Sequence, residues 1–289
     1  HMGGRGGGVW MSGGRLVDSV ISGNSVTEWN EGVGGGICLV DGLVERCVIT
    51  NNFVTSHQGG AGVHMSGGTV RNCLISANRG LYASAPNYSK GGAVHVDGGL
   101  LESCTISDNF AEGPGGGIYV DGGGVTNCIV YFNTVNPRNA DSDRNVYKGA
   151  GTFAYSCAAP DIAGVGNLSL DPEFVDRSAL NYRLKAVSPC LDKGTNTSWM
   201  AGNVDLGGSS RMLGSAVDMG AYETPDPSLG PMQVNFSASA TVGFTNLQSV
   251  FTATAVGLDT NITYFWWDFN VGGVPAMTRE GAGLWTVTN

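Results

Sequence analysis

Residues 115–133 read GGGIYVDGGGVTNCIVYFN, and this stretch decides the fold because the chain repeats it. The repeated unit occurs five times without gaps: Val9–Asn24, Ile37–Asn52, Val63–Asn78, Val94–Asn109 and Ile118–Asn133. Successive copies begin 28, 26, 31 and 24 residues apart, so the unit is constant and the connector between units varies. A period of about 20–30 residues is typical of a solenoid.

The columns of this alignment indicate how the side chains point. Apolar residues lie two positions apart at the start of each copy, as in Ile118 and Val120, which is the pattern of a strand with one buried face. Gly-Gly or Asp-Gly then turns the chain into a second apolar strand. Every copy closes on an asparagine, and these residues form one column: Asn24, Asn52, Asn78, Asn109 and Asn133. We predict an all-β fold, a right-handed parallel β-helix whose buried amides bond to the amides above and below them.

A second column is made of cysteines that occupy one inward position on successive copies: Cys47, Cys73, Cys104 and Cys128. We interpret them as buried, reduced thiols that act as small hydrophobic groups, with Cys157 extending the column. Cys38 belongs to an outward column and is the expected reactive thiol.

Charge and hydropathy exclude several classes of function. The net charge of −9 argues against a nucleic acid partner and against an anionic membrane surface. No stretch of about 20 apolar residues occurs, so the chain is not expected to span a membrane. His1-Met2 is typical of a cloning remnant, and we expect the chain to begin partway through a longer solenoid.

Beyond Gly151 the repeat gives way to short motifs. They read D-P-E-F at 171–174, Y-R-L at 182–184, S-P-C-L-D-K-G at 188–194 and V-D-M-G-A-Y-E at 217–223. This pattern resembles bacterial secreted right-handed β-helix proteins with a "choice-of-anchor Q" C-terminal region, and with the coils the resemblance covers about residues 5–224. The GGG-I element is also similar to repeats of polymorphic outer-membrane adhesins. The resemblance implies a secreted or cell-surface location and no single activity.

The remaining chain predicts a second domain. We expect the β-helix over 1–224, a Pro-rich linker over 225–231 and a small β-sandwich over 232–289. Tyr264–Phe269 resembles the Y-x-W-D-F segment of PKD-type immunoglobulin-like modules. Because the chain stops at Asn289, earlier than that family normally would, we expect the module to be truncated.

The outward face of the first strands carries the candidate site. One column holds Trp10, Cys38, His64, His95 and Tyr119. One interpretation is a solvated sheet face of mixed residues. The other is a surface for a sugar chain, with Trp10, His64 and Tyr119 as substrate-binding residues.

Asp97 and Asp121 lie two residues further along neighbouring copies, so their Cβ atoms are expected about 5 Å apart. One of two such close carboxylates should have a raised pKa unless a cation lies between them. With His95 they are the candidate catalytic residues, and calcium is the metal expected if Asp97 and Asp121 bind one. The alternative is two solvated aspartates at Asp-Gly turns.

The function predicted from these residues is an extracellular or cell-surface β-helix protein that binds or processes polysaccharide. If it is an enzyme, the paired carboxylates and the histidine indicate a polysaccharide lyase or a glycoside hydrolase. The alternative is a non-catalytic, adhesin-like or structural surface protein. No cofactor other than calcium is expected.

An apolar stripe is predicted on a second outward column: Val20, Val48, Leu74, Thr105 and Ile129. Such stripes mark contacts. The β-sandwich, a long connector or a second copy of the protein would cover it, the last by self-association through Val20, Val48, Leu74 and Ile129. The alternative is a bend that turns the column inward.

Overall fold

A computed structural model of the chain describes residues 4–27, 32–82, 89–137 and 144–225, and the backbone of four short strands beyond them. The chain separates into two compact units, His1–Thr224 and Pro225–Asn289. Within the described ranges, helical residues occur in two short 3₁₀ segments, η2 (Arg177–Ala179) and η3 (Ser198–Met200). The predicted all-β class is confirmed.

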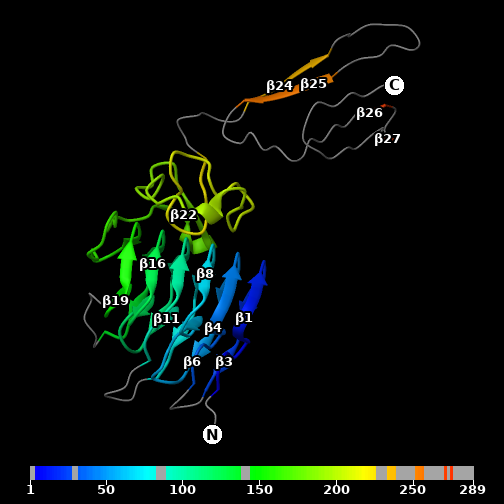
Figure 1. Ribbon diagram of the computed structural model, residues 1–289. Helices are drawn as coiled ribbons and strands as arrows, with labels where there is room; N and C mark the ends of the chain where they lie inside the picture. The colour runs from blue at the N-terminus through cyan, green and yellow to red at the C-terminus, as the bar shows by residue number, and fades with distance from the viewer. Residues whose placement is uncertain are drawn as a thin grey trace. The chain divides into compact units, whose positions relative to one another are not determined.

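Three parallel sheets form the first unit, and every repeat copy contributes strands to all of them (Figure 1). The largest sheet contains β1 (Val9–Val17), β4 (Ile37–Glu45), β7 (Val63–Met65), β8 (Thr69–Arg71), β11 (Val94–Val96), β12 (Leu100–Glu102), β15 (Ile118–Val120), β16 (Gly124–Thr126), β19 (Val146–Lys148) and β20 (Thr152–Ala154). The second contains β2 (Val20–Ser22), β5 (Val48–Thr50), β9 (Leu74–Ser76), β13 (Thr105–Ser107), β17 (Ile129–Tyr131) and β21 (Cys157–Ala158). The third contains β3 (Ser25–Val26), β6 (Phe53–Val54), β10 (Arg79–Gly80), β14 (Phe110–Ala111) and β18 (Thr134–Val135).

Neighbouring coils pair in the register that the repeat alignment predicts. Val94 lies beside Val63 on one side and beside Ile118 on the other, and these side chains are fully buried between the sheets. The structure adds a coil that the alignment missed, because Val146 of β19 pairs with Ile118 of β15. The parallel β-solenoid is therefore confirmed.

The asparagines that close the coils form one continuous set of hydrogen bonds, the asparagine row: Asn24, Asn52, Asn78, Asn109, Asn133 and Asn145. In each step the backbone N–H and the Nδ2 of one asparagine donate to the Oδ1 of the next. From Asn78 to Asn109 these distances are 2.9 and 3.0 Å. The Nδ2 of Asn109 also donates to the carbonyl of Ile75, one coil back. The predicted amide stacking is confirmed, and it satisfies polar groups that the corners would otherwise leave buried without partners.

The cysteine column is buried and its thiols are free, as predicted. Two other expectations are wrong. Cys157 does not extend the column, because the Cys128 N–H donates to Ser156 Oγ at 3.0 Å and Cys157 pairs with Ile129 in the adjacent column. Cys38 is buried rather than accessible, and this burial raises the pKa of its thiol. A raised pKa and burial both oppose thiolate reactivity.

The apolar stripe points outward and is covered by the chain itself. Val20 at its first end is 71% exposed, whereas Leu74 and Ile129 are 7% and 1% exposed. The covering segment, residues 168–224, packs on them and forms a second core with Phe174, Tyr182, Leu184, Cys190 and Met219. It contains the antiparallel pair β22 (Phe174–Asp176) and β23 (Asn181–Leu184).

Polar contacts join the covering segment to the coils. The Tyr182 hydroxyl donates to Asp108 Oδ2 at 2.9 Å, and the Ala221 N–H donates to Thr105 Oγ1 at 3.0 Å. The stripe is thus a contact surface, and at Leu74 and Ile129 it contacts the covering segment of the same chain. Because most of the stripe is buried in this way, only Val20 and part of Val48 are left for the self-association that was predicted.

A cluster of buried ionisable groups lies at the C-terminal end of the covering segment. Arg211 is fully buried, its Nη1 lies 3.3 Å from Glu223 Oε1, and its Nη2 donates to the backbone carbonyl of Asp218. The Glu223 N–H donates to Asp205 Oδ2 at 2.7 Å. Burial outweighs the attraction of Arg211 and raises the pKa of Glu223 to about 9 and that of Asp218 to about 6. The contacts of Arg211 and Glu223 join Asp205, Asp218 and Glu223 at the end of the segment.

In the second unit the structure describes the antiparallel pair β24 (Gln233–Ala238) and β25 (Phe251–Val256) and the short pair β26 (Asn270–Val271) and β27 (Val274–Pro275). The predicted β-sandwich as a whole, and the PKD-like segment Tyr264–Phe269, lie outside the described residues. Among the residues that are described, no helix is long and apolar enough to cross a membrane.

Candidate functional site

Six side chains stand in register on the outer face of the largest sheet and form the ring row: Trp10, Cys38, His64, His95, Tyr119 and Tyr147. They point outward because strand alternation turns their apolar neighbours inward. The centroids of His64 and His95 lie 5.0 Å apart, as do those of His95 and Tyr119, both edge to face. Tyr119 and Tyr147 stack in parallel at 4.6 Å.

The ring row is exposed at its ends and covered in its middle. Trp10 is 52% and Tyr147 is 37% exposed, whereas the rings between them are buried. The connectors lie over these central rings: the Gln58 backbone carbonyl accepts from His95 Nδ1, and the Lys90 ammonium lies 4.6 Å from the centre of the Tyr119 ring. The outward direction of these side chains was predicted correctly. The open surface expected for a sugar chain does not extend along the whole row, because its central rings are buried.

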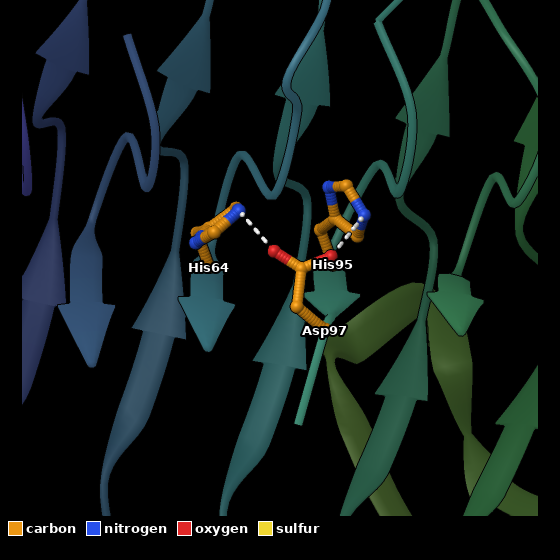
Figure 2. Close-up of side chains that lie close together, drawn as sticks. All are labelled: His64, His95 and Asp97. Carbon is orange, nitrogen blue, oxygen red and sulfur yellow. Dashed lines mark ion pairs between the residues drawn. The ribbon is translucent and has the colours of Figure 1, made fainter. Parts of the chain in front are cut away.

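The predicted carboxylates lie beside the histidines. His64 Nε2 is 3.2 Å from Asp97 Oδ2, and His95 Nε2 is 3.1 Å from Asp97 Oδ1 (Figure 2). Asp121 reaches the same ring more loosely, with its Oδ2 at 3.7 Å from His95 Nε2. Both aspartate side chains are a little under half exposed, so they connect the buried rings to solvent.

The electrostatics differ from the expectation of a raised aspartate pKa. The hydrogen bond from His64 and the adjacent His95 ring hold the pKa of Asp97 well below its usual range. The His95 ring lies between the two carboxylates, with its Nε2 at 3.1 Å from Asp97 Oδ1 and 3.7 Å from Asp121 Oδ2. Burial lowers the pKa of His64 and raises that of Tyr119 to about 12, the latter with help from the Asp121 charge.

These pKa values define what the groups can do near neutral pH. Asp97 is ionised and a weak base, and Tyr119 is protonated and a hydrogen-bond donor. His64 is neutral because its burial opposes a positive charge. The cluster is therefore suited to holding a cation or a hydroxyl-rich ligand.

The alternative interpretation, a solvated aspartate at an Asp-Gly turn, fits Asp41 and does not fit Asp97. Asp41 accepts from the Gly42 N–H at 2.7 Å, which is the local bond expected of Asp at an Asp-Gly turn. The two oxygens of Asp97 instead face the two imidazoles. The aspartates of the Asp-Gly pairs thus serve different roles on different coils.

A hollow of about 370 Å³ adjoins the cluster, and its wall includes Arg5, Cys38, Gln58, His64 and Asp97. No pattern in the sequence predicts that Arg5 or the Gln58 carbonyl lies beside these histidines. Tyr147 could have been found, because Val146-Tyr147-Lys148 repeats the apolar–ring pattern of Ile118-Tyr119, but the long connector before it hid the alignment. Trp10 is not brought to the cluster, since β4 separates β1 from β7.

Comparison with known proteins identifies the coils. A profile described as the right handed beta helix region matches residues 3–161, which is more than half of the 289 residues. No curated protein and no solved structure matches the chain. The matched range contains the ring row and every strand from β1 to β21. The chain therefore belongs to the right-handed β-helix family.

Proposed function

We propose that this protein acts outside the cell or at its surface and binds polysaccharide at the Tyr147 end of the ring row. The observation that carries the proposal is the parallel stacking of Tyr147 on Tyr119 at 4.6 Å. Tyr147 lies on β19, at the edge of the sheet that the structure describes, and it is 37% exposed. A flat, partly exposed ring suits the apolar face of a sugar.

Polar groups for sugar hydroxyls lie next to that ring. The carboxylate of Asp121, directly after β15, is 45% exposed, and the Lys90 ammonium lies 4.6 Å from the centre of the Tyr119 ring on which Tyr147 stacks. A carboxylate and an ammonium beside an aromatic face provide both an acceptor and donors for hydroxyl groups. The sequence resemblance to secreted β-helix proteins supports the extracellular location.

Cleavage of the bound chain is a second candidate function, and the cluster of Asp97, His95 and Asp121 favours it. A lyase or a glycoside hydrolase would use His95 to exchange a proton beside the two carboxylates. Binding is better supported, because the His95 side chain is only 4% exposed and a substrate would have to displace the connector over it. A purely structural, adhesin-like role would leave the exposed Tyr147 ring without a function.

The test is a panel of plant, algal and host polysaccharides, screened for binding and for reducing-end or 4,5-unsaturated products. We expect Tyr147→Ala to weaken binding about five- to tenfold, from the loss of roughly 1–1.4 kcal/mol of aromatic contact. Val187→Ala, an exposed apolar residue of the covering segment, is the control and should leave binding unchanged. Trp10→Ala tells whether the glycan spans the whole ring row.

Asp97→Asn and Asp121→Asn, singly and together, separate binding from cleavage. Product formation that disappears in these variants while binding persists would assign catalysis to the carboxylates. Binding that is unaffected by Tyr147→Ala and by both aspartate substitutions would place the glycan elsewhere. The absence of binding to every member of the panel would refute the proposal.

A further inference from the structure

Two imidazoles and one carboxylate converge at one point of the ring row. His64 and His95 are paired across β7 and β11, and Asp97 stands two residues after His95 on the same face. One ligand atom from each, an imidazole nitrogen or a carboxylate oxygen, lies within 4.8 Å of the other two. Figure 2 shows the Asp97 carboxylate between the two rings, with one oxygen directed at each.

The hydrogen on His95 Nδ1 leaves Nε2 of the same neutral ring without a hydrogen to donate. His95 Nδ1 lies in hydrogen-bond contact with the backbone carbonyl of Gln58, and a carbonyl can only accept, so Nδ1 carries the hydrogen. In the neutral ring Nε2 then presents a lone pair. That lone pair faces the carboxylate oxygen Oδ1 of Asp97 at 3.1 Å, and this oxygen also accepts rather than donates.

Two acceptors in contact repel each other in a buried place. The side chain of His95 is 4% exposed, and its Nε2 has no hydrogen-bond partner among the described residues. A positive centre must lie between Nε2 and the carboxylate, either as a second proton on His95 or as a metal ion. A metal ion also uses His64 Nε2, which faces the other oxygen of Asp97 at 3.2 Å.

We propose that His64 Nε2, His95 Nε2 and the Asp97 carboxylate bind a divalent first-row transition metal, with zinc as the first candidate. Imidazole nitrogens suit zinc, cobalt, nickel and copper, whereas calcium takes six to eight oxygen ligands. The site thus replaces the calcium predicted on Asp97 and Asp121. It does not depend on the glycan proposal.

The surroundings have the features of a metal site. The Nδ1–H of His95 is donated to a carbonyl, which is how metal-bound histidines are usually oriented. Zinc–ligand distances of about 2.0–2.2 Å place tetrahedral donors about 3.3 Å apart. The two nitrogen–oxygen separations, each to a different oxygen of Asp97, are 3.2 and 3.1 Å, and the three donors lie within 4.8 Å of one another. Three protein ligands leave a fourth position, and the adjoining hollow is where an exchangeable ligand would enter.

The experiment uses the whole protein after dialysis against a chelator, titrated with Zn²⁺ by calorimetry and with Co²⁺ by visible absorption. We expect one metal ion per chain, a rise in melting temperature with Zn²⁺, and no response to Ca²⁺. His64→Ala, His95→Ala and Asp97→Asn should each weaken binding about 100-fold or more. His57→Ala is the matched control, because His57 is the same residue type beside Gln58 and lies outside the three converging donors.

Asp121→Asn should change the affinity less than about threefold, which separates this site from the calcium alternative. Imidazole ¹⁵N chemical shifts give a readout that needs no variant: Nε2 of His64 and His95 should both shift when Zn²⁺ is added. Absence of saturable Zn²⁺ and Co²⁺ binding by the native protein, with both His95 nitrogens protonated, would overturn the proposal in favour of an imidazolium. Binding that is lost in His57→Ala, or Ca²⁺ binding that needs Asp121, would overturn it as well.

Discussion

The asparagine row and the ring row run along the same coils and use their positions in opposite ways. The asparagine row repeats one residue at every step, and each amide bonds to the next. The ring row keeps its direction but changes its residue from Trp10 through His64 to Tyr147. A residue that is identical at each coil indicates a side chain that the fold requires. Where the side chains of a row all point outward but differ in type, the fold does not determine their chemistry.

The largest effect is expected from breaking the asparagine row at its centre. Asn109→Ala removes the acceptor of the Asn78 N–H and Nδ2 and the donor to the Ile75 carbonyl. Buried groups left without partners cost about 1–3 kcal/mol each, so we expect a loss of about 3–5 kcal/mol in the free energy of unfolding. Chemical denaturation measures it.

Asn24→Ala is the matched control at the first described coil, where the side chain is partly exposed. Water can satisfy the groups that this substitution frees, so the expected loss is about 1 kcal/mol. Equal losses for Asn24→Ala and Asn109→Ala would show that the row does not act through buried hydrogen bonds.

The buried carboxyl groups of the covering segment offer a further comparison with the asparagine row. They titrate, whereas the neutral amides of the asparagine row do not. The pKa of Glu223 is raised to about 9 from an ordinary value near 4.5. Between these values the folded protein holds a proton that the unfolded chain releases, so stability falls as the pH rises through this range. The slope is at most about 1.4 kcal/mol per pH unit for one proton.

Glu223→Gln should remove this dependence, since a glutamine keeps the shape and does not ionise. Melting temperatures measured from pH 5 to pH 9 should decline for the native protein and decline less for the variant. Identical pH profiles for the two proteins would mean that Glu223 is ionised in the folded state and paired with Arg211 at 3.3 Å.

The smallest effect on stability is expected in the ring row itself. Tyr147 lies on an edge strand and is 37% exposed, so Tyr147→Ala should lower the free energy of unfolding by about 1 kcal/mol or less. Thermal or chemical denaturation checks this on the same preparation that is used for glycan binding. A loss as large as that of Asn109→Ala would remove the distinction between the two rows.

The parts of the fold that repeat were predictable from the sequence, and the parts that fold back were not. Asn109 and Val94 could be placed because each has an equivalent on the neighbouring coils. Gln58 has none, so its contact with His95 could not be foreseen. The same cause explains the expectation for Cys38, whose outward direction was correct while its burial depends on segments outside the repeat.

For the candidate site, the alternation of strands was enough to group His95, Asp97, Tyr119 and Asp121 on one face. It could not tell which oxygen meets which nitrogen, so His95 was assigned to proton transfer and His64 to substrate binding, and the alternative calcium site was built from the aspartates and loop oxygens. The covering segment was recognised as irregular coils. Its packing on Leu74 and Ile129 could not be foreseen, because contacts between residues so far apart in the chain have no periodic signal in the sequence.

The hydrogen bonds of the asparagine row all point the same way. Each amide turns its nitrogen toward the later coil and its oxygen toward the earlier one, from Asn24 to Asn145. Aligned amide dipoles add, and each bond polarises the next in a buried chain. The side-chain amides of the row are therefore aligned along the solenoid axis, with their oxygens toward the Asn24 end and their nitrogens toward the Asn145 end, although no ionised side chain takes part.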